Sequence, residues 1–94
     1  MRKLAWDNSF KRAFKKYTRH NQKLKELIFN TLNELAKDPF RPKLKTHKLS
    51  GHLKGLWACW VEYDCRIIFT FERDMETGEE IIVLIDLGTH DEVY

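Results

Sequence analysis

The 94-residue sequence has no apolar run long enough to cross a lipid bilayer. The apolar run at 81–85 has the length of one buried strand, whereas a membrane-spanning helix needs about 20 apolar residues. The N-terminus turns polar by Asp7, so we expect no secretion signal and no contact with a membrane. These features are typical of a globular protein of the cytoplasm.

Cysteine is scarce as well, since Cys59 and Cys65 are the two in the chain. Their spacing is neither that of a zinc knuckle nor that of a redox motif, and no two histidines show metal-ligand spacing. We therefore expect two free thiols, no bound metal and no cofactor.

Acidic residues are rare in the first half of the chain. Residues 1–54 hold 15 Lys and Arg against four Asp and Glu, a net charge of +11, whereas residues 55–94 hold two against ten, a net charge of −8. A strongly basic half is typical of nucleic-acid-binding proteins, because Lys and Arg that neutralise phosphates release condensed counterions. A solvated helix face would explain the same charges, so charge alone leaves RNA binding open.

Apolar residues at helical spacing predict two consecutive helices. After a short first strand at 4–6, polar residues 7–9 can cap a helix that begins near Phe10. Asn21 can cap the second helix, which should end at Asp38 because the following proline disfavours helix before it. The two apolar stripes predict an αα-hairpin packed on a core. The stripes comprise Phe10, Ala13, Phe14 and Tyr17 in the first helix and Leu24, Leu27, Ile28, Leu32 and Leu35 in the second.

Strand-forming residues dominate the second half. The basic segment 40–46 should be an extended connection, followed by a short strand at 47–49 and a turn between Gly51 and Gly55. Three further strands are predicted at 56–62, 65–72 and 79–86. The order β-α-α-β-β-β predicts an α+β fold, an antiparallel sheet with a two-helix hairpin packed on one face. This length suffices for one domain, residues 1–94, with any active site on the surface of its single core.

A two-residue turn at Tyr63 and Asp64 would fix the register of the central hairpin. It pairs Glu62 with Cys65, Val61 with Arg66 and Cys59 with Ile68, and cross-strand partners share a face. One face then carries Trp57, Cys59, Val61, Arg66, Ile68 and Thr70, and the helix-packed face carries Ala58, Trp60, Glu62, Cys65, Ile67, Phe69 and Phe71. The two cysteines would lie on opposite faces, with Arg66 exposed beside Trp57. A bulge or a slip of one residue would reverse this assignment.

Arg66 is an isolated cation within an otherwise apolar strand, and its fixed fork of donors suits a phosphate. A surface ion pair with a nearby carboxylate would explain it equally well. If it is exposed, its truncation should cost little stability. His47, His52 and His90 lie in loops or near strand ends, where a histidine can transfer protons near neutral pH or can simply be a surface residue.

Four segments, 47–51, 53–57, 63–69 and 88–94, together with the basic helical hairpin, carry a resemblance to a known family. In order and spacing they resemble toxins of the RelE/ParE superfamily, most closely the YafQ branch of the RelE/YafQ toxins, over nearly the whole chain. The resemblance implies the toxin of a type II toxin-antitoxin system. It further implies a metal-independent endoribonuclease, an mRNA interferase, that enters the ribosomal A site and cleaves messenger RNA.

The implied reaction is attack of a ribose 2′-hydroxyl on the adjacent phosphate, which leaves a 2′,3′-cyclic phosphate and a 5′-hydroxyl. It requires a base, a cation facing the phosphate and an acid for the leaving oxygen. By position, Arg66 matches the family's phosphate-stabilising arginine, and His47, Asp64 and His90 match positions that supply base and acid. Tyr94 matches a terminal aromatic residue that packs against a base or orients the scissile nucleotide.

Two positions depart from the family's pattern. Trp60 stands where YafQ-type enzymes carry a second histidine, and Cys59 and Val61 stand where the RelE branch carries lysines. One proton-transfer partner is therefore missing or replaced, and His52 is a candidate for that role.

The implied partners are the 70S ribosome, messenger RNA and a cognate antitoxin, acidic in part, that folds on binding. Operator DNA would be bound only through the antitoxin. The same fold also serves ParE-type toxins that inhibit gyrase, and a non-catalytic RNA-binding module would need only the basic half; Arg66, His90 and Tyr94 together favour the nuclease. The residues expected to contact ribosome or RNA are Lys11, Arg12, Lys15, Lys16, Arg19, Lys45, Lys48 and Lys54.

Overall fold

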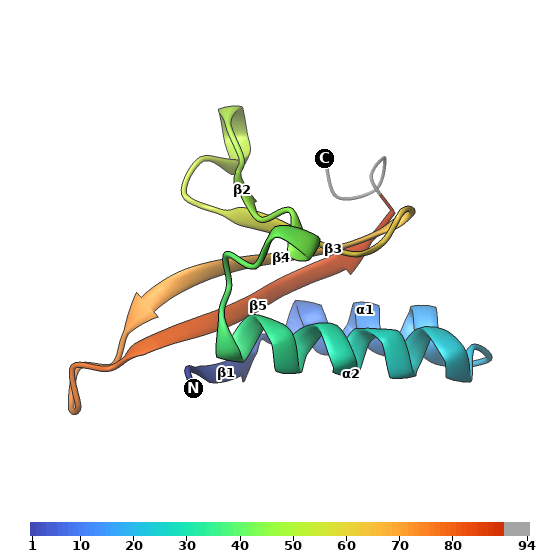
Figure 1. Ribbon diagram of the computed structural model, residues 1–94, viewed down its shortest axis with the longest axis horizontal. Helices are drawn as coiled ribbons and strands as arrows, with labels where there is room; N and C mark the ends of the chain where they lie inside the picture. Colours follow the sequence, from blue (N-terminus) through green and yellow to red (C-terminus); the bar gives the residue numbers. More distant parts are fainter. Residues whose placement is uncertain (90–94) are drawn as a thin grey trace.

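The computed structural model describes residues 1–89 and consists of two helices packed on one face of a five-stranded sheet (Figure 1). Helix α1 spans Asn8–Thr18 and helix α2 spans Gln22–Lys37. The predicted αα-hairpin and α+β fold are confirmed. The predictions for His90 and Tyr94 concern positions outside the described residues.

The boundaries of α2 agree with the prediction, whereas the start of α1 differs from it. The Asn21 side chain accepts a hydrogen bond from the Leu24 backbone N–H at 3.0 Å, and α2 ends at Lys37, with extended backbone at Asp38. Helix α1 begins at Asn8, slightly earlier than predicted, and Asp7 makes no side-chain cap. The Ser9 hydroxyl instead donates to the Ile85 carbonyl at 2.5 Å, which ties the start of α1 to the last strand.

The sheet has the strand order β1-β5-β4-β3-β2. Its strands are β1 (Lys3–Trp6), β2 (His47–Lys48), β3 (Trp57–Glu62), β4 (Cys65–Arg73) and β5 (Glu80–Gly88). Neighbouring strands are antiparallel except β1, which is parallel to β5 and lies at the far edge from β2. A parallel neighbour requires a crossover connection, and the helical hairpin that follows β1 begins it.

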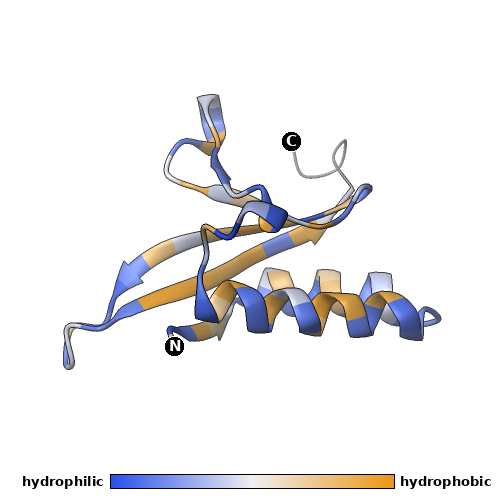
Figure 2. Cartoon of the chain, in the orientation of Figure 1, coloured by the Kyte–Doolittle hydropathy of each residue, from blue (hydrophilic) through white to orange (hydrophobic). Residues whose placement is uncertain are grey.

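The main core lies between the helices and one face of the sheet. Helix residues Phe10, Ile28 and Leu35 and strand residues Phe69 and Leu84 are all 0% exposed. The hydrophobic sides of both helices face the sheet, and their outer sides are hydrophilic (Figure 2). The opposite face of the sheet, which we call the open face, is the one not covered by α1 and α2 (Figure 1).

The predicted hairpin register is wrong beyond its first pair. Glu62 does pair with Cys65, but the register shifts at Val61, so that Arg66 pairs with Trp60 and Ile67 with Cys59. The bulge gives β3 one extra residue, which reverses its faces while those of β4 stay as predicted. Cys59 and Val61 therefore pack in the core, and Ala58 and Trp60 belong to the open face.

The bulge also brings the two cysteines together on the helix-packed side. Cys59 and Cys65 belong to the same core cluster, both as free thiols, so the predicted opposite faces are wrong and the predicted free thiols are confirmed. Burial raises the pKa of each thiol to about 12, with a smaller contribution to Cys59 from its neighbour Cys65.

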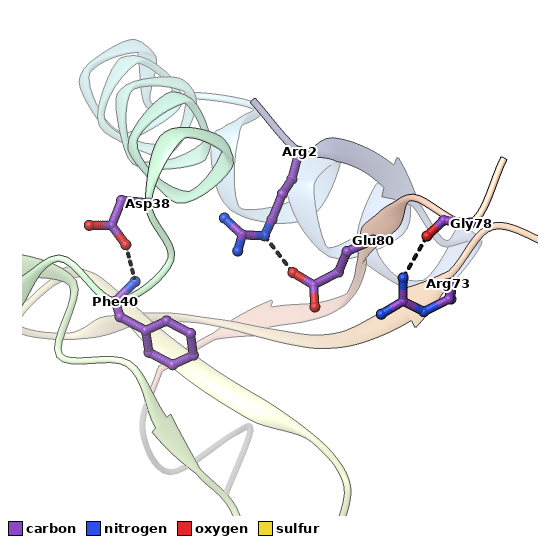
Figure 3. Close-up of polar contacts among 6 residues, drawn as sticks. All are labelled: Arg2, Asp38, Phe40, Arg73, Gly78 and Glu80. Carbon is purple, nitrogen blue, oxygen red and sulfur yellow. Dashed lines mark hydrogen bonds and ion pairs between the residues drawn. The ribbon is translucent and has the colours of Figure 1, made fainter.

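The connection between α2 and β2 is partly helical, where an extended segment was predicted. A 3₁₀ turn at Pro42–Leu44 buries Leu44 against the core, and Pro42 at its start suits the fixed proline φ. At the far end of the sheet, Arg2 pairs with Glu80, and the Arg73 guanidinium closes the β4–β5 turn on the Gly78 carbonyl (Figure 3). Neither helix among residues 1–89 is long and apolar enough to span a membrane.

Candidate functional site

Arg66 lies on the open face at the end of β4 next to the β3–β4 turn, between Trp60 on β3 and Gly88 on β5. The prediction that it is exposed is wrong, because the residue is 5% exposed. The prediction that Trp57 lies beside it is also wrong. The Arg66 guanidinium carbon is instead 3.9 Å from the ring centroid of Trp60, its partner after the bulge.

Hydrogen bonds hold the Arg66 side chain against the β3–β4 turn. Its Nη1 donates to the carbonyls of Glu62 at 2.8 Å, Tyr63 at 2.5 Å and Cys65 at 3.4 Å. Its Nε is buried and has no hydrogen-bond partner among the described residues. A buried guanidinium donor without an acceptor is costly, and an anion that reached it would remove that cost.

The indole of Trp60 contacts two cationic side chains. Besides Arg66, the ammonium of Lys45 lies 4.1 Å from the centroid of its ring. Tyr63 in the turn packs edge-on against the same indole, with ring centroids 6.1 Å apart. Trp60 thus contacts both of these basic side chains of the open face through cation–π interactions.

Lys45 has an unusual backbone. It is the one non-glycine residue within 1–89 that has a positive φ, at 50°, and it closes the 3₁₀ turn through its N–H to the Pro42 carbonyl at 3.1 Å. For a residue with a side chain, such a conformation costs on the order of 1–2 kcal/mol. Residues in rare conformations cluster at functional sites, so this backbone draws attention to Lys45.

His47 stands two residues further on, at the edge of the open face opposite Ala58. Its Nδ1 lies 2.8 Å from the Lys45 carbonyl, which can only accept, so Nδ1 is the nitrogen that carries a proton. In the neutral imidazole this leaves Nε2 as the basic nitrogen. The contact is thus compatible with a neutral imidazole whose unprotonated nitrogen is Nε2.

Two carboxylates belong to the same region. Asp64 is exposed in the β3–β4 turn beside Tyr63, as predicted for a turn residue. Asp86 was not singled out from the sequence, yet it pairs with Ile68 on the open face and accepts a hydrogen bond from the Leu87 N–H at 2.8 Å. Its only sequence signal was its place as a lone acidic residue in an apolar strand.

A small second core covers the rest of the open face. Ala58 and Ile68 are buried there beneath Leu49, Leu56 and Ile85. Next to this core, His47 and His52 line a pocket of about 320 Å³ together with residues 48–50 and Leu53. A larger hollow of about 570 Å³ lies along the β2–β3 connection, where Lys48 and Lys54 contribute positive charge.

The helical side bears the strongest positive charge. Arg12, Lys15, Lys16, Arg19 and His20 line a hollow of about 510 Å³ along α1. A neighbouring groove of about 570 Å³ has an apolar floor of Trp6 and Phe14, with a basic rim that is lined by Lys11, Lys15, Arg19 and Lys25. The predicted RNA-contacting residues therefore form two groups, one along α1 and one around the open face.

Within residues 1–89 no three His, Cys, Asp or Glu side chains come together as a set of metal ligands. The side chains that gather on the open face are a guanidinium, an ammonium, an imidazole and an indole, with the carboxylates of Asp64 and Asp86 in the same region. Such a set suits an anionic ligand with hydrogen-bond acceptors, as a phosphodiester has.

Comparison with known proteins identifies a matching family model and several similar structures. A family model described as a bacterial toxin of type II toxin-antitoxin systems, YafQ, matches residues 2–94. No curated protein sequence gives a significant match. A YoeB/ParE toxin from Agrobacterium tumefaciens superposes with a TM-score of 0.77 at 19% identity, covering 94% of this chain and 98% of that one.

Two further structures cover all of this chain. YafQ from Escherichia coli strain BL21(DE3) has a TM-score of 0.77 at 18% identity over 99% of its own length. A metal-bound toxin from Helicobacter pylori has a TM-score of 0.76 at 25% identity over 100% of its length. The structure of an E. coli toxin-antitoxin complex, DinJ-YafQ, is similar as well, with a TM-score of 0.74 at 18% identity, covering 99% of this chain and 97% of that one.

Proposed function

Because the chain belongs to the YafQ family of bacterial type II toxins, we propose that it is a ribosome-dependent endoribonuclease that cleaves messenger RNA without a metal. In this proposal the RNA lies across the open face. The ribose 2′-hydroxyl attacks the adjacent phosphate, and the products are a 2′,3′-cyclic phosphate and a 5′-hydroxyl. Such an enzyme works in the cytoplasm, where translating ribosomes are.

The observation that carries the proposal is the buried Arg66. A strand that served only the sheet would have an apolar residue there, because a guanidinium is costly to bury. Arg66 instead stacks on Trp60 and keeps its Nε without an acceptor among the described residues. Developing negative charge on a pentavalent phosphate would find there a donor that is already oriented.

Proton transfer is assigned to groups around this cation. His47, with Nε2 as its basic nitrogen, is suited to take the 2′ proton, and Asp64 and His90 are the other candidates for base and acid. Tyr94 is proposed to orient the scissile nucleotide. Which of the three acts in which step is a matter for kinetics.

The basic surface along α1 is proposed to dock on ribosomal RNA. Arg12, Lys15, Lys16 and Arg19 line one hollow, so their positive charges lie close together on the surface of α1. Docking would orient a small enzyme on its substrate, which raises the effective concentration of the reacting groups. Isolated RNA should then be cut poorly.

An antitoxin is the expected protein partner. The YafQ and YoeB toxins have been solved in complex with DinJ and YefM, respectively. We propose that this chain likewise binds a partly acidic antitoxin, and that it contacts operator DNA only through it. Growth arrest on expression of the chain alone, relieved by co-expression of the antitoxin, would support this; unaffected growth would refute the toxin assignment.

Two other functions are open to this fold, inhibition of gyrase and binding of RNA without cleavage. A purified translation system with a defined reporter message and a supercoiling assay with purified gyrase separate them. We expect cleaved message and unaffected supercoiling. Inhibited supercoiling with intact message would indicate the ParE-type function, and intact message with bound ribosomes would indicate the non-catalytic module.

The same translation system tests whether cleavage requires a bound metal ion. 1,10-Phenanthroline removes zinc and copper while leaving the magnesium that keeps ribosomes assembled. We expect cleavage to persist after this treatment. Activity that is lost and then restored by added zinc or copper would refute the metal-independent mechanism, an outcome of interest because a similar toxin from H. pylori is metal-bound.

A further inference from the structure

We infer that Lys45 is a second cation for the RNA phosphate, and that Trp60 is the positioning residue that holds it beside Arg66. This inference rests on the proposed ribonuclease function, which it deepens at one site. It gives a role to the residue that stands in place of a family histidine and to the one non-glycine residue with a positive φ within 1–89.

The first step is the geometry at the indole. The Lys45 Nζ is 4.1 Å and the Arg66 Cζ 3.9 Å from the centroid of the Trp60 ring. The two cations are thus no farther apart than the sum of these distances. Arg66 reaches the ring from β4, and Lys45 reaches it from the segment that leads into β2, on the other side of β3. One segment of RNA backbone can contact both.

The second step is accessibility. Arg66 is 5% exposed, and its Nη1 is committed to three carbonyls of the turn. Lys45 is exposed, and its ammonium carries three donors on a flexible stem. The two side chains therefore have different roles. Arg66 is buried and offers few donors in a fixed direction, whereas Lys45 is exposed and supplies a positive charge that can move with the phosphate.

The third step is the backbone of the 3₁₀ turn. A glycine at position 45 would adopt the observed φ of 50° without strain, yet the chain has a lysine there. The same residue fixes His47, whose Nδ1 lies 2.8 Å from the Lys45 carbonyl. The backbone conformation of Lys45 therefore positions two groups. It places the Lys45 ammonium on Trp60, and it places the carbonyl that contacts His47, the proposed base.

Lys48 provides a matched control. It is also an exposed lysine near an indole, with its Nζ 5.4 Å from the centroid of Trp57. Trp57 packs against the helix-side core and is remote from Arg66 in the hairpin register. Removing either lysine lowers the net charge equally, so a general electrostatic effect on RNA binding would be the same for both.

The test uses Lys45→Asn, because asparagine tolerates a positive φ and leaves the turn intact while removing the charge. In single-turnover cleavage of ribosome-bound message, we expect the maximal rate to fall by about tenfold to a hundredfold, with Lys45→Arg recovering most of it. Lys48→Asn measures the loss caused by the lower charge alone, and we expect its loss in maximal rate to be several-fold smaller than that of Lys45→Asn. Equal losses in Lys45→Asn and Lys48→Asn would overturn the inference.

The positioning role of Trp60 is tested by a double-mutant cycle. If Trp60 positions Lys45, then Trp60→Leu should slow cleavage, and the loss in the double variant with Lys45→Asn should be smaller than the product of the two single losses, because Trp60→Leu keeps only its effect on Arg66. Urea unfolding identifies any loss caused by misfolding. Independent, multiplied losses in a folded double variant would contradict the positioning role.

A binding measurement separates this inference from the proposed function. A 2′-O-methyl RNA tetranucleotide cannot be cleaved by the proposed mechanism, and its binding can be followed by the indole N–H resonance of Trp60, assigned by its loss in Trp60→Phe. We expect a shift of this resonance and binding about tenfold weaker in Lys45→Asn. Lys45-dependent binding without any cleavage would refute the nuclease and retain the phosphate site. Binding indifferent to Lys45 would refute the site, whether or not message is cleaved.

Discussion

Arg66 serves the fold and the proposed chemistry at once. Its Nη1 satisfies three carbonyls at the β3–β4 turn, and its guanidinium stacks on Trp60. From the sequence we expected an exposed residue of little importance to stability. Its burial reverses that expectation, since truncation would leave turn carbonyls without a donor and a void beside the indole.

The first prediction at this scale is that Arg66→Ala lowers the free energy of unfolding by about 2–3 kcal/mol, more than a typical surface substitution. Arg66→Lys should lower the free energy of unfolding by less, because it retains a positive charge on Trp60. Some loss should remain, because lysine lacks the planar guanidinium. Urea unfolding monitored by circular dichroism measures both. A loss in Arg66→Ala below about 0.5 kcal/mol would show that the turn does not depend on this side chain.

The second prediction concerns the buried thiol of Cys59. Burial raises its pKa from near 9 to about 12 in the native protein. The unfolded chain therefore releases this proton between pH 9 and 12 while the native protein keeps it, so stability is lost as pH rises through this range. Cys59→Ala should show a smaller loss of stability between pH 8 and pH 10.5, measured by urea midpoints.

All other ionisable groups are common to both proteins, so their contributions cancel in the comparison. Native Cys59 should also react with a thiol reagent at pH 8 only as fast as the chain unfolds. Equal pH slopes for the two proteins, together with rapid thiol reaction in the native state, would contradict a buried, protonated thiol.

Among the elements, the helices and the succession of strands along the chain were predictable, whereas the order of strands within the sheet and the register were not. Capping by Asn21, the stop before Pro39 and the helical spacing of apolar residues are local signals, and the structure confirms what they indicated. The bulge at Val61 is not encoded locally. Which hairpin register is more stable depends on which residues of β3 are buried by the helices, and these lie far away in the sequence.

The candidate site shows the same division. The sequence identified Arg66, His47 and Asp64 as candidates, but it could not reveal that the bulge turns Trp60 toward Arg66. Nor could it reveal the left-handed backbone of Lys45 or the pairing of Asp86 on the open face. These contacts depend on strands meeting in space, whereas an isolated cation in an apolar strand is visible in the sequence itself.

Helix α1 yields the third prediction. Replacing Lys15, Lys16 and Arg19 by Glu should weaken ribosome binding and flatten its dependence on salt, because fewer counterions are released. The three residues line one hollow, and the apolar face of α1 is left unchanged, so folding should be retained. Sedimentation with ribosomes at increasing salt is the measurement. An unchanged slope would mean that this face is only solvated surface.

In the whole molecule, the charge polarity of the sequence separates the helices and the two edge strands from the three central strands of the sheet. The basic residues 1–54 form the helical hairpin, β1 and β2, and the acidic residues that follow form β3–β5 and their turns. Within the acidic half, Arg66 and Arg73 are the two cations. In the proposed function, the helices and the β2 edge would attract RNA, and Arg66 would hold a phosphate on the sheet.

The central claim is that this chain cleaves RNA by making the 2′-hydroxyl attack the neighbouring phosphate. The most direct test is a message whose scissile nucleotide, mapped first in unmodified RNA, carries a single 2′-O-methyl group on the ribosome. We predict that cleavage is lost at that nucleotide, and that the unmodified message yields a 2′,3′-cyclic phosphate and a 5′-hydroxyl. Cleavage that persists at the methylated nucleotide, or products with a 5′-phosphate, would contradict the account.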